Sequence, residues 1–313
     1  MSIGRSLVEG IQRVGAAPQY LLVIYFLNVA VALVLGLVLA GALEDSLGSS
    51  LAAGNLRDSF DELWFRGFSA GASGLAATFD PAVVGIGAVF SSLDTFLQGG
   101  LFHQYAGIVG AGLLYLLAWT FCAGGFIACY RRRAQDGSFF EQGARFFPRF
   151  ALLAVMAGVL YWLIFHFVAP WAGDRVASLT HETIDERVAF AYTVIQYLLI
   201  WCLVWLVSMV FDYSKILVVV QNHRNALTAP LHALDFVRRN LGRTVGLYLA
   251  TGLVWVVLLL VYWAVAPGAG QSSTAPLLMA FLIGQLYILA RIAVRCLFYA
   301  GQTALYEAVA ISR

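Results

Sequence analysis

Six long apolar runs limit what this chain can fold into. They cover approximately residues 20–42, 105–130, 150–171, 189–211, 244–266 and 276–298. A helix needs about 20 mostly apolar residues to cross a hydrocarbon core about 30 Å thick, so each run is long enough to span a bilayer. Backbone groups in lipid must be hydrogen-bonded within the chain, which favours helices. The sequence therefore predicts an all-α, polytopic membrane helix bundle forming a single membrane domain over residues 1–313.

The composition supports this class. The chain is 61% hydrophobic and 12% charged, with a mean hydropathy of +0.82, whereas a soluble domain carries about twice that charge. All four cysteines lie in apolar runs without disulfide or metal spacing, so we expect inert thiols. The apolar run at 20–42 is too long for a signal peptide, and we expect an uncleaved anchor. The arginine-rich, nearly lysine-free composition is typical of a bacterium with a GC-rich genome.

Charge asymmetry predicts the orientation. With the N-terminus in the cytoplasm, the inner segments hold 15 of the 19 basic residues, and the outer segments hold 11 of the 17 acidic residues. The positive-inside rule then places both termini in the cytoplasm. Basic inner segments also predict contact with anionic lipid headgroups at the cytoplasmic face. We expect a multi-pass protein of the bacterial inner membrane.

The outer segment at 43–104 predicts an extracytoplasmic helical cap. Leu56, Phe60, Leu63 and Trp64 follow helical spacing. A second helix is expected from Asp80, an N-cap residue followed by proline, and it is too short and too glycine-rich to span. A re-entrant pore helix is the alternative interpretation of this second segment.

A short basic, amphipathic segment precedes each odd-numbered span. The segments are "EGIQRVGAAPQYLLV", "EQGARFFPRFALLAV" and "LDFVRRNLGRTVGLYLA". Ser138 and Glu141 make a capping-box pattern before the third span. The pattern predicts short amphipathic helices at the membrane surface and three parallel hairpin repeats. The alternative is that these basic residues only fix the orientation of the spans in the membrane, without a repeat.

Two arginines one helical turn apart, Arg291 and Arg295, lie in the last span. A charged side chain in the bilayer is costly. We expect Arg295 to extend to the inner headgroups and Arg291 to pair with Asp212 at the inner end of the fourth span. The alternative is an anion or lipid-headgroup site formed by these residues.

Other polar residues of the spans are Asn28, Gln196 and Gln285. Gln196 and Gln285 lie at similar depths, so we expect a hydrogen bond between their amides. His166 lies near the outer end of its span without a second histidine at that depth. The sequence carries no nucleotide-binding or nucleophile motif, and we expect no cofactor, no metal and no nucleic-acid partner.

The segments "VFDYSKILVVVQNHRNALTAPLHALDFVRRNLGRTVGLYL" and "GQLYILARIAVRCLFYAGQTALY" carry a resemblance. They resemble a group of uncharacterised bacterial six-helix inner-membrane proteins. These are distantly similar to the non-catalytic membrane domain of bacterial glycerophosphodiester phosphodiesterases. The resemblance covers roughly residues 120–310 and implies a bacterial inner-membrane location. It implies no activity for this chain.

Three function classes remain. We expect first a non-enzymatic structural or accessory subunit of a membrane complex, with other membrane proteins or a second copy as partners. The second class is a transporter or lipid-handling protein for an anionic lipid or organic solute. It predicts a cavity near Asn28, Gln285 and Arg291. An enzyme is the third, and the acidic residues Asp58, Asp61 and Glu62 would be its only clustered carboxylates.

Overall fold

The computed structural model describes residues 2–48, 50, 61–80, 86–97, 100, 105–131, 137–181, 185–223, 225–266 and 274–311. Every regular element in these ranges is a helix. Six of them are long and apolar enough to cross a bilayer. The prediction of an all-α polytopic bundle is therefore confirmed, and the chain is a multi-pass membrane protein.

The six spans lie in long helices. These are α2 (Gln19–Gly48), α5 (Ala106–Cys129), α6 (Phe139–Leu163) with η4 (Ile164–Val168) and α7 (Ala169–Thr180), α8 (Glu186–Val220), α10 (Leu241–Val265) and α11 (Thr274–Ile311). The predicted spans fall on these helices, but α8 and α11 continue well beyond their predicted ends at 211 and 298. Hydropathy marks the length that crosses lipid, whereas a helix continues wherever it packs against protein.

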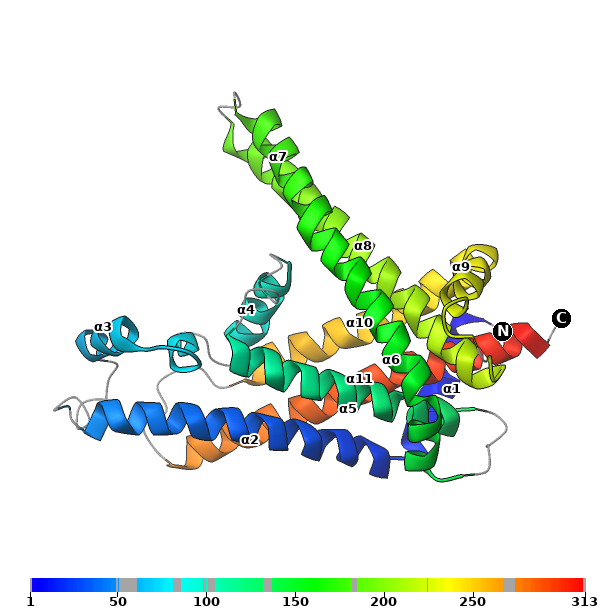
Figure 1. Ribbon diagram of the computed structural model, residues 1–313, viewed down its shortest axis with the longest axis horizontal. Coiled ribbons are helices and arrows are strands. Elements are labelled where there is room, and N and C mark those ends of the chain that lie inside the picture. The colour runs from blue at the N-terminus through cyan, green and yellow to red at the C-terminus, as the bar shows by residue number, and fades with distance from the viewer. Residues whose placement is uncertain are drawn as a thin grey trace.

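The long helices form two groups. In Figure 1, α2, α5, α10 and α11 run together along the long axis, while α6, α7 and α8 form a hairpin that leaves them at an angle. Both chain ends lie at one end of the molecule, together with α1 (Ile3–Gly15) and α9 (Ala229–Arg239). We call this the closed end, and the opposite end, where the hairpin and α2 diverge, the open end.

Three amphipathic elements gather at the closed end. Ser2 caps α1 by accepting from the backbone N–H of Arg5, 3.4 Å away. The first turns of α6 carry the predicted capping box between Ser138 and Glu141, and α9 has proline in its first turn. The second of these elements is continuous with its span, because α6 passes through Pro148 without a break.

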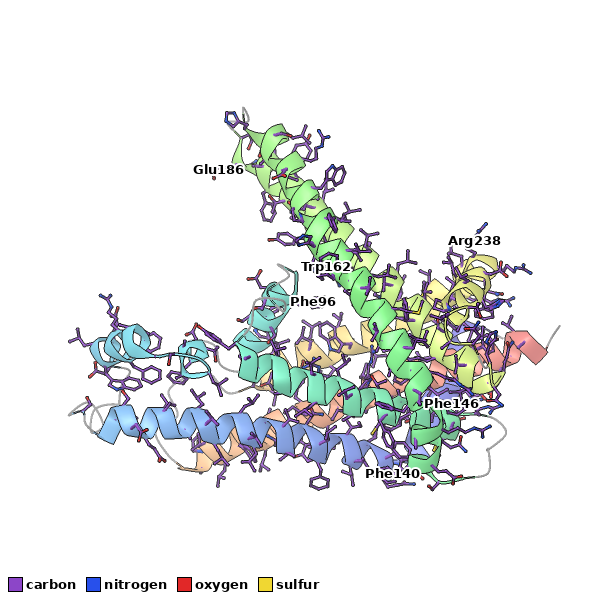
Figure 2. All side chains as sticks on the ribbon, viewed as in Figure 1. Phe96, Phe140, Phe146, Trp162, Glu186 and Arg238 are labelled. Carbon is purple, nitrogen blue, oxygen red and sulfur yellow. The ribbon has the colours of Figure 1, made fainter. Side chains whose placement is uncertain are left out.

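The protein core lies at the closed end. Its largest fully buried side chains include Phe126, Tyr130, Phe146, Tyr213 and Tyr299, and Figure 2 shows Phe146 at this end. Toward the open end the same helices expose apolar side chains, as at Leu114, Val257 and Leu282. In a membrane helix such positions face lipid. Packing of side chains against one another, within the chain, is thus concentrated where the two helix groups meet.

Short helices lie at the open end, within the segment for which a cap is predicted. They are α3 (Glu62–Gly71), η2 (Ala76–Thr78) and α4 (Ile86–Leu97). Trp64 of α3 donates through Nε1 to the Ser46 hydroxyl of α2, 3.2 Å away. Phe96 of α4 packs edge-to-face on Phe165, with ring centroids 5.6 Å apart, and so meets the hairpin (Figure 2). Leu56, Phe60 and Pro81 lie outside the described residues.

Candidate ligand site between the membrane helices

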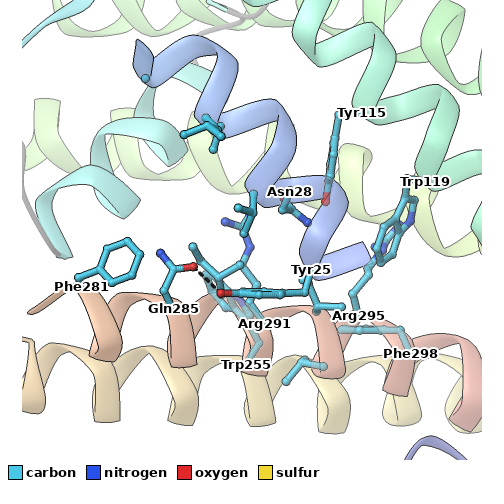
Figure 3. A pocket seen from close by; sticks show the side chains of 17 residues that line it. Tyr25, Asn28, Tyr115, Trp119, Trp255, Phe281, Gln285, Arg291, Arg295 and Phe298 are labelled. Carbon is cyan, nitrogen blue, oxygen red and sulfur yellow. Dashed lines mark hydrogen bonds between the residues drawn. The ribbon is translucent and has the colours of Figure 1, made fainter. Parts of the chain in front are cut away.

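A cleft of about 990 Å³ lies between α2, α5, α10 and α11. Figure 3 shows it from close by, with α11 on one side and α2 on the other. Aromatic and aliphatic side chains form most of its walls. They include Tyr25, Val29, Leu33, Tyr115, Trp119, Trp255, Phe281, Ile288 and Phe298.

The transport or lipid-handling class predicts a cavity near three polar residues, and all three line this cleft: Asn28, Gln285 and Arg291. Tyr25 Oη donates to Gln285 Oε1 over 3.0 Å, which joins α2 to α11 (Figure 3). Asn28 Nδ2 donates to the carbonyl of Ile24, one turn earlier, over 2.9 Å. The cleft therefore has fixed polar groups on two facing helices.

Arg291 is exposed and lines the cleft. The expected pair with Asp212 is wrong: among the ion pairs of the described residues, Asp212 meets Lys215 and Arg295 instead. The way α8 and α11 cross places Asp212 opposite Arg295, one turn further along α11 than expected. This leaves Arg291 directed to the cleft.

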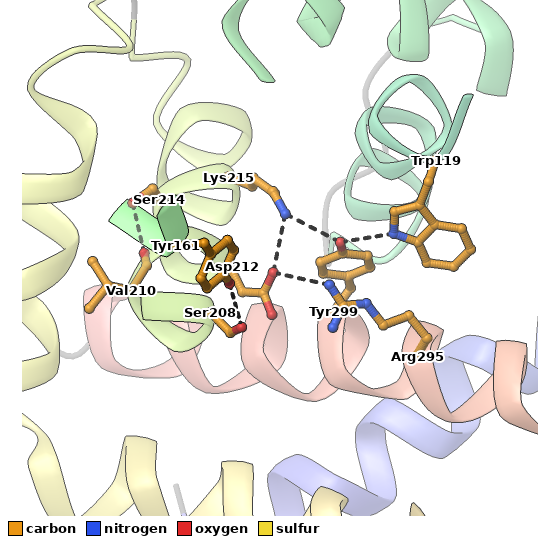
Figure 4. Close-up of polar contacts among 9 residues, drawn as sticks. All are labelled: Trp119, Tyr161, Ser208, Val210, Asp212, Ser214, Lys215, Arg295 and Tyr299. Carbon is orange, nitrogen blue, oxygen red and sulfur yellow. Dashed lines mark hydrogen bonds and ion pairs between the residues drawn. The ribbon is translucent and has the colours of Figure 1, made fainter. Parts of the chain in front are cut away.

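Asp212 is buried at the junction of the two helix groups (Figure 4). Its Oδ1 lies 3.2 Å from Lys215 Nζ, within α8, and 3.8 Å from Arg295 Nη2 of α11. Arg295 therefore turns inward, and the prediction that it extends to the headgroups is wrong. Pairing with a buried carboxylate compensates a charge that would otherwise be desolvated.

Aromatic residues complete this cluster. The Tyr299 hydroxyl accepts from Trp119 Nε1 over 3.3 Å and from Lys215 Nζ over 3.5 Å. The Arg295 guanidinium carbon and Lys215 Nζ lie 5.4 and 5.6 Å from the centre of the Tyr299 ring, within the range of cation–π attraction. Two cations thus share one carboxylate, and Asp212 Oδ2 has no hydrogen-bond partner among the described residues.

Gln196 does not join Gln285, so the expected amide bond is wrong. Gln285 meets Tyr25 instead, and Gln196 lies against α7, where a methyl group added to Gly173 would be 3.4 Å from its Nε2. The physical reason is the angle between the groups: α8 leaves α11 toward the open end (Figure 1). Equal depth in the bilayer does not imply contact.

A second charged cluster, which was not predicted from the sequence, joins α1 to α5 and α11 at the closed end. Arg13 pairs with Glu9 at 2.5 Å and with Glu307 of α11 at 3.1 Å. It also donates to the backbone carbonyl of Tyr130, at the end of α5. The i, i+4 spacing of Glu9 and Arg13 is the only local signal for it. These bonds hold three helices together and are structural.

The clustered carboxylates Asp61 and Glu62 have local structural roles. Asp61 caps α3 by accepting from the backbone N–H of Trp64 over 3.0 Å, and Glu62 pairs with Arg66 on the same helix at 2.6 Å. Asp58 lies outside the described residues. His166 stacks on Trp162, with ring centroids 4.9 Å apart.

No family model, no curated protein and no solved structure matches this chain. The resemblance to six-helix bacterial inner-membrane proteins accordingly stays a prediction.

Proposed function

We propose that this chain is a non-enzymatic lipid-handling protein that binds an anionic amphiphile in the cleft between α2, α5, α10 and α11. The observation that carries the proposal is Arg291, a cation that lines an intramembrane cleft without an ion pair among the described residues. A cation in the bilayer is costly unless an anion or water compensates it. An anionic headgroup supplies that compensation.

The shape of the cleft suits a lipid. The lining residues of α11 run from Phe281 to Phe298, which is about 26 Å at 1.5 Å per residue. From Arg291 to Phe281 the distance is about 15 Å on the same basis, half of a hydrocarbon core about 30 Å thick. A lipid with its headgroup at Arg291 would lay one leaflet's length of acyl chain along Leu33 and Phe281.

We further propose that the closed end faces the cytoplasm of a bacterium. The basic residues Arg5, Arg145, Arg149, Arg238 and Arg239 belong to the elements of that end, as the positive-inside rule requires. Arg291 would then lie in the cytoplasmic half of the bilayer. The ligand would enter from the inner leaflet.

The proposal is tested by native mass spectrometry of the full chain, extracted gently so that bound lipids are retained. We expect an anionic lipid in stoichiometric amount on the wild type and its loss from Arg291→Gln. Arg243→Gln is the matched control, because Arg243 is exposed at the start of α10, away from the cleft. Equal lipid retention by both variants would contradict the proposal.

The second candidate is an accessory subunit of a membrane complex. The feature that favours it is the hairpin of α6, α7 and α8, which diverges from the other helices and exposes Val159, Phe167 and Leu198. Such a surface could accept a helix of another subunit. The same mass spectra test it, because a protein partner of fixed stoichiometry would appear in place of the lipid.

A further inference from the structure

We propose that Arg291 and Arg295 together hold the headgroup, and that this headgroup is a phosphomonoester with close to two negative charges. The inference rests on the proposed function and specifies its ligand. It follows from the positions of the two arginines and from a count of the charges around them.

Both arginines reach the same cleft. They are one turn apart on α11, about 6 Å along the helix axis, and both line the cleft. Arg295 is 40% exposed in its side chain although its Nη2 lies 3.8 Å from the buried Asp212. The aliphatic stem lines the cleft, while the guanidinium group is directed toward Asp212 and Tyr299, and its Nη2 atom is the one nearest the carboxylate (Figures 3 and 4). A guanidinium has five N–H donors, enough to serve a carboxylate and a phosphate together.

The charges near the cleft are not balanced. Asp212 is the carboxylate of its cluster, and it is closer to Lys215, at 3.2 Å, than to Arg295. One negative charge therefore faces two positive ones. Among the described residues that line the cleft, the charged ones are Arg291 and Arg295. The two arginines give the cleft lining a charge of +2, and the buried Lys215 and Asp212 behind Arg295 cancel each other, so the net charge of the region stays at +2.

A phosphomonoester matches that count. It carries about −1.5 to −2 at pH 7 and presents three acceptor oxygens, whereas the phosphodiester of most anionic lipids carries a single charge. In a medium of low dielectric constant, the second negative charge of the phosphomonoester is strongly attracted to the two guanidinium groups. Paired guanidinium groups also suit the oxygens of a terminal phosphate geometrically. Asp212 and Lys215 act as positioning residues, since they fix Arg295 without reaching the cleft themselves.

The test is a lipid titration of the full chain in micelles, followed by native mass spectrometry. The probes are phosphatidic acid, a phosphomonoester, and phosphatidylglycerol, a phosphodiester with matched chains, above the second phosphate pKa of about 6. We expect phosphatidic acid to bind about tenfold more tightly, equivalent to about 1.4 kcal/mol. Arg295→Gln should reduce this preference to about twofold or less, while Arg243→Gln should leave it unchanged. Inorganic phosphate serves as a competitor, and we expect it to displace phosphatidic acid only in large excess.

The outcomes separate this inference from the proposed function. Equal binding of both lipids to the wild type, weakened in each case by Arg291→Gln, would overturn the phosphomonoester while leaving the amphiphile site in place. Binding that is indifferent to Arg291→Gln would overturn both. Displacement by inorganic phosphate at an equal concentration would make the ligand a free anion and overturn the lipid. The wild-type comparison decides the inference even if Arg295→Gln does not fold.

Discussion

Arg295 Nη2 lies 3.8 Å from Asp212 Oδ1 across the junction of α11 and α8, while Arg291, one turn away, lines the cleft. The two arginines therefore differ in their contacts within the protein despite their equal chemistry. Arg295 belongs to a buried cluster that joins the hairpin to the rest of the bundle. Arg291 has no acidic partner among the described residues and is free to meet a ligand.

Loss of Asp212 should destabilise the protein strongly. Asp212→Asn removes the carboxylate that compensates Lys215 and Arg295, and breaking a buried pair in this way costs about 3–5 kcal/mol. The matched control is Asp235→Asn, because Asp235 and Arg239 form an exposed pair at 2.9 Å, worth about 0–1 kcal/mol. Thermal unfolding in micelles measures both. Equal melting temperatures of the two variants would contradict a stabilising role for the cluster.

Gly10 should not tolerate a side chain. A Cβ at Gly10 would lie 2.9 Å from the backbone nitrogen of Gly301, so α1 and α11 would have to separate. We expect Gly10→Ala to lower the free energy of unfolding by about 1–3 kcal/mol. Gly4→Ala, on the same helix with nothing within 4 Å, should be neutral or slightly stabilising. Thermal unfolding of the two variants measures the difference.

Thiol cross-linking should report the divergence of the two helix groups. In a background lacking the four native cysteines, a short bifunctional thiol reagent should cross-link Tyr25→Cys with Gln285→Cys, because the native side chains meet at their ends across α2 and α11. It should not cross-link Gln196→Cys with Gln285→Cys, because Gln196 lies against α7. Gel mobility after treatment with the reagent reads out both pairs. Efficient cross-linking of the second pair would mean that the hairpin closes onto α11.

Membrane orientation gives a further prediction. Ser69 of α3 and Gly4 of α1 are both exposed and lie at the open and closed ends. In the cysteine-free background, an impermeant thiol reagent applied to intact cells should label Ser69→Cys. It should label Gly4→Cys only after the membrane is permeabilised. The reversed pattern would place the closed end outside the cell.

The fold was largely predictable because hydropathy and helix length depend on local sequence. Six spans, the capping box at Ser138 and the short helices between the first two spans all follow from spacing and residue type. A cleft beside Asn28, Gln285 and Arg291 was a prediction of the second function class, the transporter or lipid-handling protein, and not of the accessory subunit expected first.

The contacts between helices could not be predicted in the same way. Whether Asp212 meets Arg291 or Arg295 depends on where α8 and α11 end and on how they cross, and a single turn changes the answer. Gln196 and Gln285 share a depth, but the angle of the hairpin separates them. The role of Arg13 rests on contacts with α5 and α11, which no local pattern encodes.

The central claim is that the cleft holds an anionic amphiphile at Arg291, and photolabelling tests it most directly. A phosphatidic acid with a diazirine in its acyl chain would be irradiated with the full chain in bilayer nanodiscs, and the labelled peptides would be sequenced. We predict label concentrated in residues 25–36 of α2 and 281–298 of α11, and its loss in Arg291→Gln but not in Arg243→Gln. Label spread evenly over the lipid-facing helices, including α6 and α8, and unchanged by Arg291→Gln would contradict the claim.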